Sequence, residues 1–395
     1  MTMSRRHLIA GLGGASAHAP TTERVEAAQP KSPDVADRSS TIRITKVTPN
    51  LCRDRVFVRI DTNHGVSGWG EVKGIIPTVA VELVRSMTSL LDGQNPTRIE
   101  HLWQSLFRAE RNQRGGGLML HTISGIDMAL WDIAGKLWGV PVYRLLGGAV
   151  RDKIRVYPSP SALKVSVGVR GHGADPADVE AMVQVIKNAR QRVGPKGTVM
   201  FDAHCSVPPA ALKQLAGMIQ PYDVRFIEEP AVPGTMEVFR QIRAAIKVPL
   251  ATGERDRTIW GILPYLTEGI VDFVQPDVGH TGGLSQMKKI AALAEAHYVP
   301  LVPHCTQSYL GMTASFHVTA TAPLFMIHEA YDDELWGKIV RPHWTKDKDG
   351  YVSLPEGTGL CVDVDEAMLK KVAAEPYKYQ WRGPRYLEDG SVADY

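Results

Sequence analysis

Two hydrophobic periods divide the folded part of the chain. From residue 41 to residue 71, apolar and polar residues alternate, as expected for strands with one buried face. The short segments 63–65 (NHG) and 67–70 (SGWG) contain turn-forming residues, so we expect both to be turns between antiparallel strands.

Between residues 76 and 147 the apolar positions recur every three or four residues, and Gly147 and Gly148 close this stretch. That period predicts helices. Strands followed by helices predict an α+β capping domain over residues 42–150.

From about residue 153 to about residue 325, short apolar runs alternate with helix-like segments. This alternation is typical of a parallel α/β fold, so residues 151–355 are expected to form a barrel domain. Residues 356–395 contain one more strand-like piece and an aromatic-rich end, which we expect to return to the capping domain.

The start of this barrel domain is unusually short. Only 45 residues separate Tyr157 from Asp202, and the two apolar runs at 153–157 and 162–169 are separated by residues 158–161 alone. A parallel crossover needs about a dozen residues. The helix after the first barrel strand is therefore expected to be absent, or the strand pairing there to be rearranged.

Three acidic residues follow consecutive apolar runs at equal intervals of 26 residues: Asp202, Glu228 and Glu254. Each is expected at the carboxyl end of its strand, where parallel α/β barrels build their sites. An all-oxygen set of ligands suits Mg²⁺. The alternative, three solvated loop acids, is disfavoured by the repeated spacing.

Residues suited to proton transfer continue this series. Asp277 and His304 fall at the next two predicted strand ends, and an Asp that orients a His makes a general base. His204 lies two residues after Asp202, and in an extended segment it would face the same cavity. Glu329 follows a further apolar run and could hydrogen-bond to a substrate carboxylate. A single histidine of this kind is more often structural, so the interpretation rests on the whole set.

Candidate substrate contacts are less specific. Arg255 and Arg257 follow Glu254 and could bind an anionic or polyhydroxylated ligand, or be solvated loop charges. His280, in the segment VGHTGG, could contact substrate or cap the following helix.

Composition excludes several classes of protein. The net charge is only +3, without the clustered basic stripe of a nucleic-acid-binding protein. Four widely spaced cysteines without a CxxC pair argue against a disulfide framework or a structural zinc site. No stretch approaches the about 20 apolar residues of a membrane span.

The first 41 residues are expected to be an export-signal-like segment and a disordered tether. Ser4, Arg5 and Arg6 precede a Gly/Ala-rich stretch and the sequence AHA at 17–19, which is similar to a twin-arginine signal with its cleavage site. We therefore expect a periplasmic protein. An unprocessed basic tail on a cytoplasmic protein is the alternative.

Taken together, the motifs of residues 42–395 resemble the enolase superfamily, in its mandelate racemase-like branch, and within it the galactonate/gluconate-type acid-sugar dehydratases. The segment 114–136 resembles the signature of the family's capping-domain helix, and the barrel motifs agree in order and spacing. The resemblance implies a capping domain and a (β/α)7β TIM-like barrel, and a homo-oligomer acting on a small-molecule acid sugar.

The resemblance also implies roles. Asp202, Glu228 and Glu254 would bind Mg²⁺. The pair of His304 and Asp277 would take the proton alpha to the carboxylate, Mg²⁺ and Glu329 would stabilise the enediolate, and His204 would protonate the departing 3-hydroxyl. The product would be a 2-keto-3-deoxy acid.

Racemases of this branch carry a second base in a K-x-K motif. Here Lys164 matches the first lysine, a possible substrate contact, but Ser166 stands at the base position, which favours elimination over racemisation. The nearby segment with Arg170 and His172 could form a pocket wall. A cycloisomerase or epimerase acting through the same enediolate, and a non-catalytic binding protein, remain the alternatives.

Overall fold

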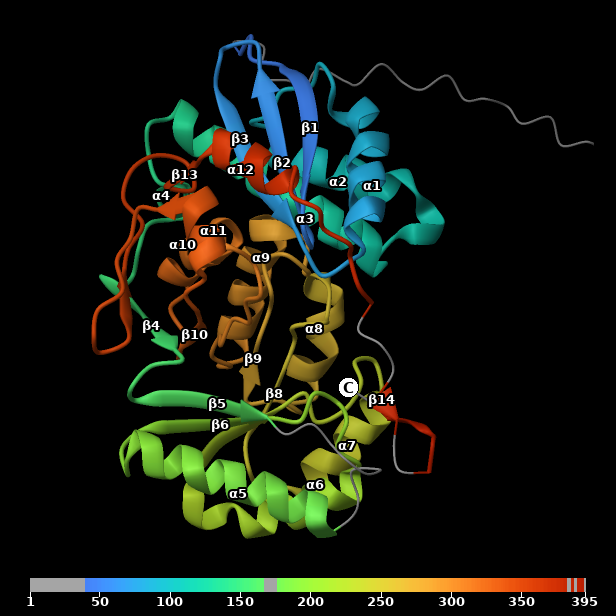
Figure 1. The fold of residues 1–395 in the computed structure, drawn as a ribbon, viewed down its shortest axis with the longest axis vertical. Helices are drawn as coiled ribbons and strands as arrows, with labels where there is room; N and C mark the ends of the chain where they lie inside the picture. The colour runs from blue at the N-terminus through green and yellow to red at the C-terminus, as the bar shows by residue number, and fades with distance from the viewer. Residues whose placement is uncertain (1–39, 167–175, 382–384, 387–388, 394–395) are drawn as a thin grey trace, which may run out of the picture. The chain divides into compact units, whose positions relative to one another are not determined.

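The computed structural model describes residues 40–166, 176–381, 385–386 and 389–393. The export-signal-like segment and nearly all of the tether lie outside the described residues, and so do Arg170 and His172. The fold of the described part is shown in Figure 1.

The capping domain begins with an antiparallel sheet in the order β1 (Ile44–Cys52), β2 (Arg55–Thr62) and β3 (Ser67–Val72). The prediction of a turn at 67–70 is wrong, because these residues begin β3. Their glycines serve close packing instead. A Cβ at Gly68 or Gly70 would lie 2.1 or 1.8 Å from a carbonyl oxygen of α3 (Gly117–Leu137).

The predicted helices of the capping domain lie beside this sheet (Figure 1). The central helix α3 is buried along most of its length and its mean composition is apolar, as expected for a helix enclosed on several sides. The others are α1 (Pro77–Leu91), α2 (Ile99–Ala109), the 3-10 turn η1 (Arg111–Gln113) and α4 (Val142–Leu145).

The second domain is a TIM-type barrel built on parallel strands. Five strands, β5 to β9, pair in sequence order. Single parallel bridges then join Val274 to Leu301 and Leu301 to Phe325. Phe325 is shortly followed by β10, which pairs with β4. The strands are β4 (Lys153–Tyr157), β5 (Ala162–Ser166), β6 (Thr198–Asp202), β7 (Val224–Glu228), β8 (Leu250–Thr252), β9 (Phe273–Val274) and β10 (His328–Glu329).

The connection from β4 to β5 contains residues 158–161 and no helix. It is a tight turn in which Ser159 and Ala162 form an antiparallel bridge. Within the described residues β4 pairs with β10 on one side and with β12 (Tyr351–Ser353) on the other, and it forms no ladder with β5. In Figure 1, β4 accordingly lies beside β10, while β5 runs along β6.

Helices follow the other barrel strands and cover them with apolar side chains. They are α5 (Pro176–Val193), α6 (Pro209–Met218), η2 (Gln220–Tyr222), α7 (Met236–Ala245), α8 (Thr258–Thr267), α9 (Gly283–Ala296) and α10 (Tyr309–Ala320).

A layer of buried side chains fills the barrel below the functional residues. Met200, Phe226, Val302 and Ile327 belong to this layer, and each lies two residues before a predicted site residue. Because side chains in strands alternate with a period of two, the site residues form the next layer up, at the carboxyl ends of the strands.

Two buried carboxylates of the capping domain fasten it to barrel helices. Asp127 of α3 accepts hydrogen bonds from the backbone N–H and the hydroxyl of Ser285, at the start of α9. Glu71 of β3 accepts from the backbone N–H and hydroxyl of Ser308, which precedes α10. Asp127 thereby caps the first turn of α9 from the other domain, whereas Glu71 holds Ser308, which itself caps α10 by accepting from the N–H of Leu310.

The C-terminal part continues with α11 (Glu334–Ile339), β11 (Val340–Pro342), β13 (Val362–Val364), α12 (Glu366–Ala373), β14 (Arg385–Tyr386) and β15 (Val392–Ala393). It contacts the capping-domain sheet, since Glu366 pairs with Arg59 and Glu375 lies 2.7 Å from Arg53. No helix among the described residues combines the length and apolar character needed to cross a membrane.

Candidate active site

The three acidic residues of the equal-interval series meet at one point. Asp202 ends β6, Glu228 ends β7 and Glu254 follows β8 by two residues. One oxygen from each lies within 4.8 Å of the others. Asp202 and Glu228 are buried, and like charges in a region of low dielectric constant are costly unless positive charge balances them.

Two cationic side chains approach these carboxylates. Lys164 of β5 places its Nζ 2.6 Å from Glu228 and 3.3 Å from Asp202. His204 places its Nε2 2.9 Å from Asp202. Burial alone would raise the pKa of the Asp202 carboxyl, but the hydrogen bond from His204 and the charge of Lys164 hold that pKa below its usual value.

His204 faces this cluster for a different reason than its spacing suggested. The extended backbone expected there is wrong, because His204 and Cys205 both have left-handed backbone angles, with φ of 44° and 56°. The N–H of His204 donates to Asp202 Oδ1 at 2.9 Å. This local turn folds the imidazole back onto Asp202.

Glu228 has a further buried partner. Gln275, in the segment QPD, donates from Nε2 to Glu228 Oε2 at 2.7 Å. Burial and the nearby charge of Asp202 raise the pKa of the Glu228 carboxyl well above its usual value, and a neighbouring cation would favour its charged form.

The three carboxylates fit a hard divalent cation. They supply oxygen ligands only, from three adjacent strands, and they enclose a shared point with an open pocket beside it. Those are the ligand type and geometry that suit Mg²⁺.

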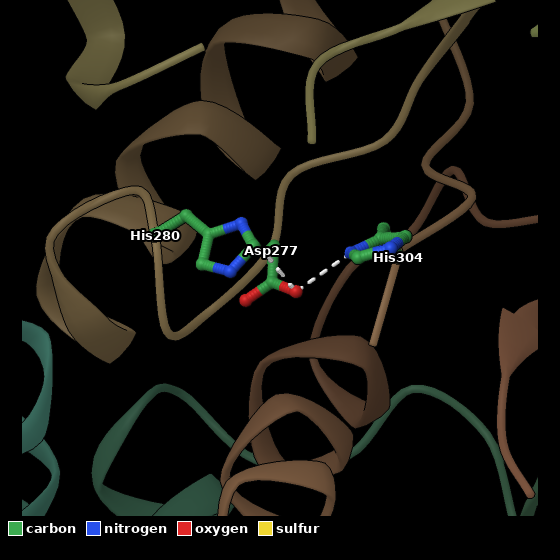
Figure 2. Close-up of side chains that lie close together, drawn as sticks. All are labelled: Asp277, His280 and His304. Atoms are coloured by element: carbon green, nitrogen blue, oxygen red, sulfur yellow. Dashed lines mark hydrogen bonds and ion pairs between the residues drawn. The ribbon is translucent and has the colours of Figure 1, made fainter. Parts of the chain in front are cut away.

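Asp277, three residues after β9, and His304, three residues after the bridge residue Leu301, form a hydrogen-bonded pair. Figure 2 shows the Asp277 carboxylate between His280 and His304, with the hydrogen bond directed to His304. His304 Nδ1 lies 2.7 Å from Asp277 Oδ2. A carboxylate accepts, so Nδ1 donates and Nε2 is turned toward Glu254 and Glu329, at 3.3 and 3.7 Å.

Electrostatic effects in this pair have a clear origin. Burial alone would raise the pKa of Asp277, but His280 and His304 hold it below its usual value. Burial alone would lower the pKa of His304, but Glu254, Glu329 and Asp277 raise it to about 10. A cation bound at Glu254 would offset part of this negative charge and bring the pKa of His304 back down.

Glu329 joins the two groups of residues. Its Oε2 accepts a hydrogen bond from the backbone N–H of Cys305 at 3.1 Å, and its Oε1 lies 3.5 Å from Lys164. It ends β10, on the far side of the ring from Glu228.

A pocket of about 490 Å³ opens above these residues. His280 and Arg255 line it, whereas Arg257 does not. His280 also does not cap α9, whose first turn is capped by Asp127. Its Nδ1 instead lies 2.9 Å from the carbonyl of Glu254.

The capping domain reaches this pocket at Gly74, and His121 of the same domain packs against the pocket residue His280. Gly74 lines the pocket, and a Cβ there would lie 2.7 Å from His121 Cε1 and 3.0 Å from His280 Nε2. His121 of α3 stacks on His280 with ring centroids 4.3 Å apart. A glycine after β3 is therefore required by the close approach of the two histidines.

Arg255, in the pocket lining, is held by Glu229, a residue that the sequence patterns did not indicate. Its Nε donates to Glu229 Oε1 at 2.6 Å, and it contacts the Cys205 thiol. Burial and Glu254 raise the pKa of Glu229 to about 7. Burial raises the pKa of the Cys205 and Cys305 thiols, in agreement with packing rather than nucleophilic roles.

Two glutamines that contact site residues were also not predicted from the sequence. Gln275 precedes Asp277 by two residues, and Gln307 follows His304 by three. Their position next to an acid or base was the only available signal, and it does not reveal which atoms they contact.

Comparisons with known proteins agree with this geometry. Residues 39–147 match the N-terminal domain of the mandelate racemase / muconate lactonizing enzyme family, and residues 153–368 match the enolase C-terminal domain-like family. A D-galactonate dehydratase of Ralstonia pickettii (strain 12J) is 34% identical over 386 residues, covering 90% of this chain and 100% of that protein.

Solved structures show the same architecture. A mandelate racemase/muconate lactonizing enzyme-like protein from Rubrobacter xylanophilus DSM 9941 matches with a TM-score of 0.79 and 29% identity, over 85% of this chain and 98% of that chain. The 3,6-anhydro-D-galactonate cycloisomerase from Zobellia galactanivorans matches with a TM-score of 0.77 and 27% identity, over 84% and 99%. The chain therefore belongs to the mandelate racemase / muconate lactonizing enzyme family of the enolase superfamily.

Proposed function

We propose that this protein is a Mg²⁺-dependent sugar-acid dehydratase, a hydro-lyase that converts an acid sugar into a 2-keto-3-deoxy acid. D-galactonate dehydratases at 31–34% identity, each aligned over its whole length, support the dehydratase assignment. The observation that carries the mechanism is the hydrogen-bonded pair of His304 and Asp277 beside three convergent carboxylates.

Asp202, Glu228 and Glu254 would hold the Mg²⁺. When bound, the ion supplies positive charge beside the substrate carboxylate, where negative charge develops after loss of the alpha proton. Lys164 lies between Glu329, at 3.5 Å, and Glu228, at 2.6 Å. It is therefore suited to contact the substrate carboxylate.

His304 removes the alpha proton through Nε2. Asp277 keeps Nδ1 protonated, so the lone pair of Nε2 faces the pocket. Glu329, within 3.7 Å of His304 Nε2, would donate or share a hydrogen bond with an oxygen of the substrate carboxylate.

His204 completes the elimination as the general acid. The electron pair left by the alpha proton forms the carbon–carbon double bond, the C3–O bond breaks, and His204 protonates the leaving hydroxyl to release water. The resulting enol takes up a proton from solvent at C3 and becomes the 2-keto-3-deoxy acid. Asp202, 2.9 Å from Nε2 of His204, favours its protonated form before the transfer.

A panel of acid sugars with Mg²⁺ tests the proposal. We expect keto-deoxy acid from at least one member, with exchange of the alpha proton in deuterated solvent, and loss of both in His304→Asn. Absence of turnover and exchange across the panel would instead favour a non-catalytic binding protein.

A cycloisomerase is the second candidate, because the Zobellia galactanivorans cycloisomerase has the same fold over most of its length. It would share the alpha-proton step, so exchange does not discriminate. An isomeric product in place of a keto-deoxy acid would identify it. Ser166, at the position where racemases of the family carry a second base, disfavours racemisation.

A further inference from the structure

Gln307 lies directly behind the pair of Asp277 and His304, and the proposed reaction gives it no role. It sits in the loop between His304 and α10, and only 1% of its surface is exposed. An amide is costly to bury unless its polar atoms are hydrogen-bonded. A buried glutamine at this place therefore calls for an explanation.

The hydrogen bonds of Gln307 all lie around the Asp277 carboxylate. Its Nε2 donates to Asp277 Oδ1 at 2.8 Å. Its Oε1 lies 3.3 Å from the backbone N–H of Thr306 and 3.4 Å from the Cys305 thiol, both of which can donate. A carboxylate oxygen only accepts, so these partners fix which end of the amide faces Asp277.

Asp277 is thereby held at both oxygens. Oδ1 accepts from Gln307 and from the backbone N–H of Gly279, at 2.8 and 2.7 Å, while Oδ2 accepts from His304 Nδ1 at 2.7 Å. With three donors in fixed places, the carboxylate has one orientation, and that orientation aims Nε2 of His304 at the pocket.

Two glycines enclose the Gln307 side chain. A Cβ at Gly279 would lie 2.4 Å from its Nε2, and a Cβ at Gly311 would lie 2.5 Å from its Cβ. Neither glycine has a positive φ, so both are required here for space. The surrounding backbone is shaped to admit an amide at this point.

We propose that Gln307 is a positioning residue that fixes the rotation of the Asp277 carboxylate, and through it the direction and tautomer of His304. This inference rests on the proposed function, since it takes His304 as the base. Outer groups of this kind typically change activity by about 10- to 100-fold when removed, because small displacements of reacting groups are costly.

The test compares Gln307→Met, which keeps the volume but removes the amide, with Gln286→Met. Gln286 is equally buried, at 1% exposed, but among the described residues the hydrogen-bond partner of its side chain is the N–H of Ile259 in α8, which donates to Oε1. The readouts are kcat, KM, the dissociation constant of Mg²⁺, the melting temperature, and the low-field proton NMR signal of the His304 Nδ1–H.

We expect Gln307→Met to lower kcat by about 10- to 100-fold, with KM and Mg²⁺ affinity nearly unchanged, and to shift or broaden the low-field signal. Gln286→Met should lower only the melting temperature. Should Gln307→Met fail to fold, Gln307→Glu retains the shape but replaces the donor with a second carboxylate facing Asp277, and it should lose kcat at least as strongly.

Two results would overturn the inference: kcat within about twofold of the wild type in a folded Gln307 variant, or equal losses of kcat in Gln307→Met and Gln286→Met. The proposed function has a separate check in His304→Asn. An active His304→Asn refutes the base assignment itself, whereas an inactive one beside a fully active Gln307→Met refutes only the role of Gln307.

Discussion

The two sides of the pocket are held in place by different forces. The metal wall, which we define as Lys164, Asp202, His204, Glu228 and Glu254, brings carboxylates together against their mutual repulsion and balances them with cations. The base wall, which we define as Asp277, His304, Gln307 and Glu329, is held mainly by directional hydrogen bonds in a well-packed loop.

This difference suggests how each wall should fail. Charge balance is adjustable, because another cation can replace a lost one. Hydrogen-bonded orientation is not adjustable in that way, because a missing or misplaced donor leaves a buried acceptor without its partner. Defects in the metal wall should therefore respond to added Mg²⁺, and defects in the base wall should not.

The largest effect is expected for Asp277→Asn in the base wall. The amide preserves the shape but no longer requires a proton on Nδ1 of His304, so the base can adopt the wrong tautomer. We expect kcat to fall by about 10³- to 10⁴-fold, with Mg²⁺ affinity unchanged by calorimetry. Asp363→Asn, at an exposed position, is the control, and recovery of the Asp277→Asn variant at high Mg²⁺ would contradict the comparison.

Next in size is the loss of stability in Lys164→Met, in the metal wall. Removing the ammonium leaves Glu228 without its cationic partner and Asp202 with His204 alone, and breaking a buried pair costs about 3–5 kcal/mol. We expect this loss in denaturant unfolding with a chelator present, and a much smaller loss with saturating Mg²⁺.

Lys338→Met, on an exposed helix face, should change stability by less than about 0.5 kcal/mol in either condition. Equal destabilisation of Lys164→Met with and without Mg²⁺ would show that charge balance is not what holds this wall.

Glu254→Gln should weaken Mg²⁺ binding by about 100-fold, or about 2.7 kcal/mol, because it replaces a charged ligand with a neutral one. Activity should recover in part as Mg²⁺ is raised. Titration calorimetry and activity against Mg²⁺ concentration measure both effects, with Glu334→Gln at an exposed position as the control. Unchanged Mg²⁺ affinity would remove Glu254 from the metal site.

The smallest effect is expected for Gly279→Ala. The added methyl group would lie 2.4 Å from Gln307 Nε2 and should push the amide away from Asp277. A loss in kcat of about tenfold is expected, with no response to Mg²⁺. Gly217→Ala, where nothing lies within 4 Å of the added methyl group, provides the control. Recovery of Gly279→Ala activity on addition of Mg²⁺ would contradict the expectation that defects in the base wall do not respond to Mg²⁺.

The spacing of apolar residues alone predicted much of the secondary structure. The helices of the capping domain, the alternating strands and helices of the barrel, and the four-residue connection between β4 and β5 all followed from the spacing of apolar runs. The turn expected at 67–70 was wrong, because glycines that signal turns in a sequence can equally signal close packing. Gly68 and Gly70 admit the backbone of α3, a contact with residues about 60 positions away.

The sequence also placed the candidate residues on one edge of the barrel. Asp202, Glu228, Glu254 and Asp277 each end a strand or follow one by a few residues, and His304 follows the bridge residue Leu301 by three. Parallel strands bring their carboxyl ends together. His204 was selected by the same reasoning, but the left-handed turn that directs it to Asp202 is a local geometry that its spacing did not reveal.

By itself, then, the sequence determined which strand ends carry acids and bases, because strand period and chain order fix where a residue lies along a barrel. Tertiary structure alone decided which atoms those groups contact. Lys164 among the metal carboxylates, Gln307 behind Asp277, and His121 of the capping domain stacked on His280 all depend on side-chain directions and on packing between segments distant in sequence. Hydrogen bonds and ion pairs act over a few ångströms, and distances of that size are set only when the domains are packed together.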